Sequence, residues 1–297
     1  MKALLLGSDG FLGRHFFKHL IKLGYQITCV DIKSGIDARE FFKQNETQYD
    51  LVIHLAAIVG GRNLFENKPW ELFSNFELDS GFLQWCLKAN PKKIITFSSS
   101  AAYPHELQLE GSSHKLVESD IDLLNIKNPD PSIYGWSKLN LEVLVDHSRK
   151  AGLEVYLFRP FSGYGEDQGL DYPFCSFVDR VIKRENPFNI WGPGSQVRDF
   201  IHVDDIVNAA ITAIHTVKPD NYNLCTGIPT SFNDLAELVI KYKSDYAPEI
   251  KRQLDKPVGV YYRVGEPSKM LGFYKPKISL EEGIERSFWR LDRGRNS

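Results

Sequence analysis

Cysteine is scarce in this sequence, and the cysteines present do not form a recognisable site. The four of them stand far apart, with neither CxxC nor Cys/His spacing, at Cys29, Cys86, Cys175 and Cys225. This pattern argues against a zinc site and against a disulfide framework. It favours a reducing, cytoplasmic setting, because disulfides form and persist in oxidising compartments.

Long hydrophobic runs and an excess of one charge are also missing. No apolar run approaches the ~20 residues that cross a bilayer, and the chain starts with strand-like residues rather than a cleavable signal pattern. The net charge of −2 gives no reason to expect nucleic acid or an anionic membrane as a partner. At 297 residues the chain is long enough for one large domain or two closely joined ones.

What the sequence does contain is a glycine turn between a strand and a helix near its start. Leu4-Leu5-Leu6 runs directly into a GxxGxxG stretch, and an amphipathic helical pattern follows. In such a turn the first glycine permits the tight bend, the second lets the backbone approach a pyrophosphate, and the third allows close helix packing. Amides at the helix start would meet the phosphate charge. The expected dinucleotide-binding residues of this turn are Gly7, Gly10, Phe11, Leu12 and Gly13.

An acidic residue at the end of a second strand supports this interpretation. The strand-like stretch Tyr25–Val30 ends at Asp31, at the spacing of about twenty residues that dinucleotide folds use. A carboxylate there accepts hydrogen bonds from a ribose diol and repels a 2′-phosphate, so NAD is favoured over NADP, although Lys33 could soften the preference. Asp37 and Glu40 form the pattern of a capping box for a short helix. Asp37 is also a candidate for contact with the adenine edge.

Two further strands end in residues suited to a ligand site. The apolar run 49–54 predicts a buried strand, and it leads into the small residues Leu55-Ala56-Ala57, which let a flat cofactor pass. A helical pattern over 69–88 carries Asn75 midway. The strand expected over 92–97 then ends in Ser98-Ser99-Ser100, at the sheet edge where open parallel sheets bind ligands.

The most informative pair of residues is Tyr134 and Lys138. They stand four apart at the head of an expected helix, so both side chains lie on one face. A nearby cation favours phenolate and would lower the pKa of the tyrosine. The phenol could then take or give a proton near neutral pH, as a general acid–base must.

Together these motifs resemble the extended short-chain dehydrogenase/reductases, and within them the NAD-dependent nucleotide-sugar epimerase/dehydratase branch. The resemblance covers residues 1 to about 290. It implies an α/β fold with a Rossmann-type, doubly wound parallel sheet and a smaller C-terminal substrate domain. The NAD-binding domain would take residues 1–165, with 198–226 returning to it, and the nucleotide-sugar domain 166–197 and 227–297. It also implies a homodimer and NAD contacts by Leu55, Ala56, Ala57, Asn75, Tyr134, Lys138 and Phe161.

The resemblance extends to the substrate site. The loop Arg159–Gly165 would pass the nicotinamide and the sugar, and Ser162 stands where the family usually has Asn. Arg198 matches the branch's hallmark and carries a planar fork suited to a diphosphate, and Arg263 resembles the second arginine at the same phosphates. Asp204 and Asp205 look like a metal pair, but we expect them to cap a helix and expect no metal site.

The choice of reaction depends on the residues around the serines. Tyr103-Pro104 sets a register that selects Ser99 as the catalytic serine, with Ser100 as the alternative and both as substrate contacts. Ser100-Ala101 replaces the Asp-Glu of the family's 4,6-dehydratases, and the sugar-acid decarboxylases usually have Glu in place of Ala101. Val59-Gly60-Gly61 resembles GDP-fucose synthase and GDP-mannose 3,5-epimerase, but these carry a cysteine in place of Ala101. Tyr172 or Cys175 would have to substitute for that cysteine.

What remains is chemistry that needs only Ser99, Tyr134, Lys138 and tightly held NAD. That chemistry is C4 epimerisation of a nucleotide sugar through a 4-keto intermediate. A 4-keto-sugar reductase with the same three residues is the near alternative, and Asp31 favours the epimerase because reductases more often draw on NADPH. A dinucleotide-binding sensor without turnover is the other class left open.

Overall fold

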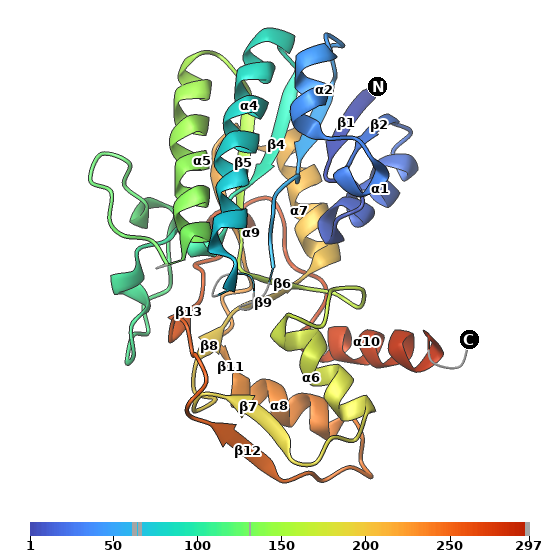
Figure 1. Cartoon of the computed structure of the whole chain (residues 1–297), viewed down its shortest axis with the longest axis vertical. Helices are drawn as coiled ribbons and strands as arrows, with labels where there is room; N and C mark the ends of the chain where they lie inside the picture. The colour runs from blue at the N-terminus through green and yellow to red at the C-terminus, as the bar shows by residue number, and fades with distance from the viewer. Residues whose placement is uncertain (61–63, 65–66, 131, 295–297) are drawn as a thin grey trace.

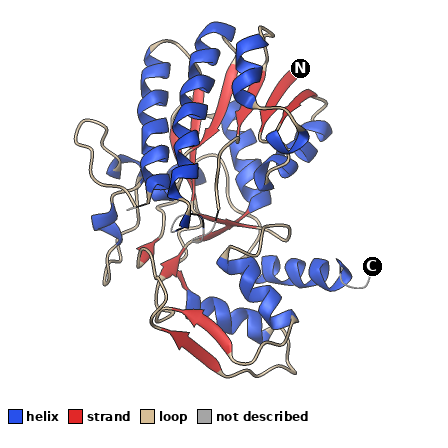
Figure 2. Ribbon diagram, in the orientation of Figure 1, coloured by secondary structure: helices blue, strands red, loops and turns tan. Residues whose placement is uncertain are grey.

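The computed structural model describes residues 1–60, 64, 67–130 and 132–294, so Gly61 of the glycine pair lies outside the described residues. The chain forms two units, a larger one built on a parallel sheet and a smaller one below it (Figure 1, Figure 2). No helix in these ranges is both long and apolar enough to cross a membrane.

The larger unit is organised around a six-stranded parallel sheet. The strand order is β10-β5-β4-β3-β1-β2, and the register pairs Leu6 with both Val30 and His54, so neighbouring strands end at one edge. The central strands are buried on both faces, which explains their near-continuous apolar sequences. The strands are β1 Lys2–Leu6, β2 Gln26–Val30, β3 Leu51–His54, β4 Lys93–Phe97, β5 Val155–Pro160 and β10 Asn221–Leu224.

Helices cover both faces of this sheet, as Figure 2 shows. On one face α1 (Phe11–Lys22) packs beside α7 (Val203–Thr216), and their apolar side chains share one core with β1, β3 and β5. On the other face lie α2 (Ala38–Gln44), α4 (Ser74–Ala89) and α5 (Ile133–Lys150), which share the second core. The α/β class and doubly wound parallel sheet expected from the sequence are therefore confirmed.

The smaller unit has its own core. It contains α6 (Pro173–Ile182), α8 (Phe232–Lys241) and α10 (Leu280–Gly294), whose buried side chains meet in one cluster. Short strands complete it and join it to the larger unit: β6 Ser162–Tyr164, β7 Phe188–Trp191, β8 Val197–Arg198, β9 Phe200–His202, β11 Thr230–Ser231, β12 Ile250–Gln253 and β13 Tyr262–Arg263. The remaining short helices are η1 Ile32–Ser34, η2 Pro69–Phe73, η3 Ser100–Ala102, η4 His105–Gln108, η5 Glu118–Asp120 and α9 Ser268–Leu271.

The chain crosses between the units more often than the expected domain boundaries allow. As the sequence indicates for residues 198–226, α7 and β10 return to the larger unit. A second return lies at the end of the chain, where Met270 and Tyr274 are buried in the core that contains α1 and α7. The boundaries expected from the sequence assign this segment, within residues 227–297, to the smaller unit.

Two helix-start predictions need correction. The side chain that caps α7 is His202, whose Nδ1 accepts from the Asp204 amide at 3.1 Å. Asp205 instead accepts the Tyr274 hydroxyl at 2.7 Å and the Lys277 amide at 2.9 Å, so it anchors the returning segment. At α2, Asp37 caps the Arg39 amide at 2.9 Å, but the Glu40 side chain pairs with a lysine instead of closing a capping box.

Candidate active site

A cleft of about 1120 Å³ opens at the carboxyl ends of the parallel strands and extends into the smaller unit. An open parallel sheet places its ligands at this edge. Most of the site residues expected from the sequence line it: Gly7, Gly10, Phe11, Leu12, Gly13, Asp31, Leu55, Ala56, Ala57, Ser99, Tyr134, Lys138, Phe161, Ser162, Arg198 and Arg263.

Three expected site residues are not among the described residues that line the cleft. Asn75 is buried, and its side chain bonds both the amide and the carbonyl of Ile58, at 2.7 and 2.9 Å. Asn75 therefore holds a cleft-lining segment in place without facing the cleft. Asp37 lies on the surface, where the Arg39 guanidinium lowers its pKa. Ser100 is buried within η3.

The glycine turn has the shape that a dinucleotide needs. Gly7 has a φ of +80°, and a Cβ there would come within 2.7 Å of the Ala56 backbone. A Cβ on Gly13 would lie only 2.1 Å from the Gly7 carbonyl oxygen, so α1 could not approach the turn with a larger residue. At the start of α1 no side chain caps the helix, and its first turn holds no acid. The free amides and the helix dipole make this end suitable for a pyrophosphate.

Asp31 occupies the end of β2 next to this turn. Its two carboxylate oxygens accept the Asp9 amide at 2.8 Å and the Lys33 amide at 2.9 Å, which fixes the side chain at the cleft wall. An ionised carboxylate has about four lone-pair positions, so acceptor capacity remains for a ribose diol.

The expected catalytic residues converge from two elements. Ser99 caps η3 directly after β4, while Tyr134 and Lys138 stand on one face of α5. A Cβ on Gly135 would lie 2.8 Å from the Ala101 carbonyl oxygen, so this glycine lets α5 press against η3. The close approach places the Tyr134 phenol in a hydrogen bond with Ser99.

The electrostatics of Tyr134 differ from the sequence-based expectation. Burial raises its pKa to about 12, the Asp79 carboxylate acts in the same direction, and the Ser99 hydrogen bond and the Arg263 charge oppose the shift. Lys138 is 5% exposed and its ammonium donates to the Phe97 carbonyl oxygen at 3.0 Å. The predicted lowering of the tyrosine pKa by this lysine is therefore wrong, because desolvation by burial is the largest cause of the shift.

A buried polar network that the sequence did not reveal supports this edge of the sheet. Arg159 is 1% exposed and binds Glu142 through Nε at 2.9 Å and Nη2 at 2.5 Å. Ser98 donates to the same carboxylate at 2.6 Å, and Arg159 also donates to the Tyr103 hydroxyl at 2.9 Å. These contacts tie α5, which carries Tyr134 and Lys138, to the ends of β4 and β5.

The two arginines expected at the phosphates are direct neighbours. Arg198 of β8 pairs in register with Arg263 of β13, and both line the cleft. Arg198 lies over the Phe232 ring at 5.5 Å. Arg263 is held by the chain itself, with Nε donating to Gln108 at 2.5 Å and Nη2 donating to Asp130 at 2.8 Å. Asp130 also lines the cleft and was not singled out from the sequence.

The two residues considered as substitutes for an epimerase cysteine differ in position. Cys175 is 1% exposed, its thiol donates to the Gly165 carbonyl at 3.3 Å, and burial raises its pKa to about 12. It is not among the described residues that line the cleft. Tyr172 does line the cleft, and burial raises its pKa to about 12, with the Tyr134 phenol acting in the same direction.

Comparison with known proteins agrees with this geometry. The model of the NAD dependent epimerase/dehydratase family matches residues 3–225. The chain belongs to this family.

A relative from Methanocaldococcus jannaschii, provisionally assigned as a UDP-glucose 4-epimerase, is 30% identical across 95% of this chain and 96% of its own. The UDP-glucuronate 4-epimerase of Thermodesulfobacterium geofontis is 29% identical across 96% of this chain and 94% of its own. The crystal structure of the Thermotoga maritima UDP-glucose 4-epimerase with UDP-glucose superposes with a TM-score of 0.83, at 25% identity, and covers 99% of each chain.

Membership of the epimerase/dehydratase family makes the chain an NAD-dependent enzyme of the extended short-chain dehydrogenase/reductases. The structure fits this cofactor. The uncapped start of α1 and the glycine turn suit its pyrophosphate, and Asp31 suits its ribose. No group of three or more His, Cys, Asp or Glu side chains in the described part of the chain is arranged for a metal ion.

Proposed function

We propose that this enzyme epimerises a nucleotide-diphosphate sugar at C4 through a 4-keto intermediate. The observation that carries the proposal is the convergence of Ser99, Tyr134 and Lys138 at the end of β4, with Ala101 beside them. Ala101 can supply neither the carboxyl group of a dehydratase nor the thiol of a 3,5-epimerase. The reaction left open to these side chains is removal of a proton from a hydroxyl and its return.

Each residue of the site has its own role in the proposed reaction. The glycine turn and Asp31 would hold NAD, which would supply the hydride-transfer chemistry at C4. Tyr134 takes the proton of the 4-hydroxyl in the first half and gives it back in the second. Ser99 hydrogen-bonds this phenol, which favours its ionised form, and also binds the sugar oxygen. Lys138 lies over the Tyr134 ring and donates to the Phe97 carbonyl, so it lines the site beside the phenol. Arg198 pairs with the diphosphate of the substrate.

The two carboxylates near the sugar end do not favour dehydration or decarboxylation. Asp130 is engaged with Arg263 and with the Ser132 amide at 3.1 Å, and these partners hold its pKa below its usual value although burial opposes them. Asp171 also lines the cleft but is exposed. A general acid in these reactions must hold a proton near neutral pH, and Asp130 is held ionised.

The deciding experiment incubates the purified protein separately with UDP-, GDP- and dTDP-hexoses and follows the sugar configuration by NMR. Conversion at C4, without net consumption of NAD, supports the proposal. Consumption of NADPH with a nucleotide 4-keto sugar, without epimerisation, would show a reductase. Binding of NAD with no turnover of any sugar would show a dinucleotide sensor.

A further inference from the structure

The loop 165–172 joins β6 to α6 and forms part of the cleft wall. All of its residues are described, and they form neither a strand nor a helix, so side-chain contacts must fix its place. Four of them line the same cleft as the glycine turn: Gln168, Gly169, Asp171 and Tyr172.

The start of this loop packs against the glycine turn and α7. A Cβ on Gly165 would lie 3.1 Å from the Phe11 ring and 2.6 Å from the Val203 side chain, so the backbone has no room for a larger residue here. Phe11 follows the second glycine of the turn and itself lines the cleft. The loop therefore meets the first turn of α1 directly, at the end of that helix that suits the cofactor.

Asp167 ties the loop to the two residues that follow the third glycine. Its carboxylate oxygens accept Nε2 of His15 at 2.9 Å and Nη2 of Arg14 at 3.0 Å, and the same Nη2 donates to the Asp167 carbonyl at 3.2 Å. The Asp167 side chain is 6% exposed. Burial opposes its charge, but the bonds from His15 and Arg14 hold the pKa of Asp167 well below its usual value, so these bonds are charge-assisted.

The charges around this contact support an ionised Asp167. Arg290 of α10 adds a cation 3.9 Å from its carboxylate. The neighbouring acid of the loop, Glu166, lies 3.4 Å from His202 instead. Asp204 of α7 lies 3.1 Å from the other nitrogen of the imidazole that binds Asp167, which favours a charged ring. Asp167 is thus the member of this network that belongs to the loop and binds α1.

We propose that Asp167 is a positioning residue that fastens the loop 165–172 to α1 and thereby retains NAD between the loop and the glycine turn. The inference rests on the NAD-dependent family and not on the proposed C4 reaction. A ligand enclosed by a loop leaves when the loop moves. Here that movement would separate a buried carboxylate from two charged donors, which is costly, so opening is rare while the contact is intact.

The test uses NADH as a fluorescent probe and measures its release by stopped-flow mixing of the NADH-loaded protein with excess NAD. In Asp167→Asn, which keeps the shape but loses the charge, the dissociation rate should rise at least roughly tenfold. Amide hydrogen exchange of residues 165–172 should also become faster. Asp167→Glu keeps the charge and should restore slower release. Asp220→Asn is the matched control, because Asp220 forms a 2.6 Å ion pair with Lys269 away from the described cleft lining, and its rate should equal that of the wild type.

His15→Gln removes one of the two charged donors, so it should raise the dissociation rate in the same direction by a smaller factor. This variant decides the question if Asp167→Asn does not fold. Equal NADH release from the wild type and these variants would overturn the inference, and so would faster loop exchange without faster release, or equally fast release from Asp220→Asn. A protein that retains NADH through Asp167 but epimerises no sugar would contradict only the proposed function.

Discussion

The pKa of Tyr134 depends on the burial of its side chain and not only on its spacing from Lys138. The four-residue interval to Lys138 correctly indicates that both side chains face one cleft. The interval carries no information about solvent, and burial decides the direction of the pKa shift. Because burial raises the pKa of Tyr134 to about 12, only a small fraction of the phenol is ionised near neutral pH.

Tyr134→Phe should remove the group that handles the hydroxyl proton. We expect turnover to fall by roughly 10²- to 10⁴-fold, while NAD stays bound, because the ring still packs in the same place. For the wild type, kcat/KM should rise with pH from neutral toward alkaline values as the phenolate fraction grows, since the pKa is raised. Tyr172→Phe is the matched control, and it should retain most of the activity. A Tyr134→Phe enzyme with near-normal turnover would contradict the proton-transfer role.

Asp31 is the second residue whose role can be isolated. Asp31→Ala removes the ribose acceptor at the end of β2 and the charge that repels a 2′-phosphate, so the affinity for NAD should fall relative to that for NADP. Fluorescence titration of the protein with each nucleotide measures the ratio. Asp37→Ala offers a control, since Asp37 is a nearby acid whose side chain is engaged by Arg39 on the surface. An unchanged NAD/NADP ratio in Asp31→Ala would show that another group sets the preference.

At the scale of elements, strands and helices of the larger unit could be predicted because their apolar periodicity reflects burial against one sheet. The strand expected over 92–97 is β4 at Lys93–Phe97, and the helix expected over 69–88 divides into η2 and α4. The contacts between elements could not be predicted in this way. Asp205 and Asn75 bind backbone groups far along the chain, at Lys277 and Ile58, and no local pattern indicates such partners.

The loop after β6 is attached to α1 by a histidine between two carboxylates. His15 places Nε2 2.9 Å from Asp167 and Nδ1 3.1 Å from Asp204. Both ring nitrogens donate to a carboxylate, so both are protonated and the ring is positively charged. Burial opposes that charge, but the two carboxylates raise the pKa of His15 to about 9. Arg14 reinforces the contact with a 3.0 Å bond to Asp167. This loop continues to Tyr172, which lines the cleft.

The raised pKa of His15 predicts a pH-dependent stability. The folded state holds the proton more tightly than the unfolded chain, so the contribution is fully present below about pH 6.5 and is lost as the pH rises through about 9. Thermal unfolding followed by circular dichroism should show a midpoint that declines over this window in the wild type. The decline should be smaller in His15→Gln and unchanged in His114→Gln, a control at an exposed histidine. Equal pH profiles for the wild type and His15→Gln would exclude this coupling.

For the whole molecule, the sequence indicated two units but not how the chain joins them. Asp199 lies at the crossing and is fully buried. Its carboxylate accepts the amides of Thr226 and Gly227, each at 2.8 Å, and that of Gly265 at 3.2 Å. One side chain therefore fixes three segments that are far apart in sequence. The cleft between the units depends on such long-range contacts, which explains why Arg263 was predicted but its partner Asp130 was not.

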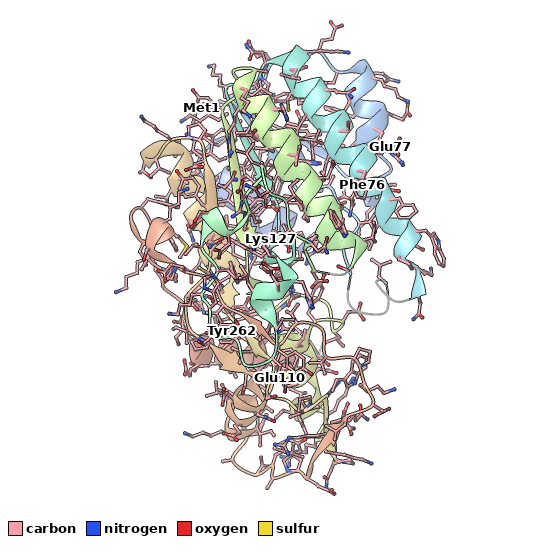
Figure 3. All side chains as sticks on the ribbon, turned by 90° about the vertical axis from the view of Figure 1, so that its left-hand side faces the viewer. Met1, Phe76, Glu77, Glu110, Lys127 and Tyr262 are labelled. Atoms are coloured by element: carbon pink, nitrogen blue, oxygen red, sulfur yellow. The ribbon has the colours of Figure 1, made fainter. Side chains whose placement is uncertain are left out.

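The face of the larger unit formed by α4 and α5 is a candidate interface for the predicted homodimer. Figure 3 shows α4 and α5 side by side on this face, with Phe76 and Glu77 on α4. Large hydrophobic side chains stand exposed along η2, α4 and α5, at Trp70, Phe73, Leu87 and Trp136. Large exposed apolar side chains are common at protein–protein interfaces, and a two-fold dimer would bring the same face of each copy together.

Phe73→Glu should therefore disrupt self-association, because it places a charge on this face where Phe73 is 59% exposed. Size-exclusion chromatography with light scattering should give the mass of two chains for the wild type and of one chain for the variant. Leu254→Glu is the matched control, because Leu254 is 74% exposed in the smaller unit, after β12, and its mass should remain that of two chains. A wild type with the mass of one chain at micromolar concentration would rule out the dimer. A dimer that survives Phe73→Glu would place the interface on another face.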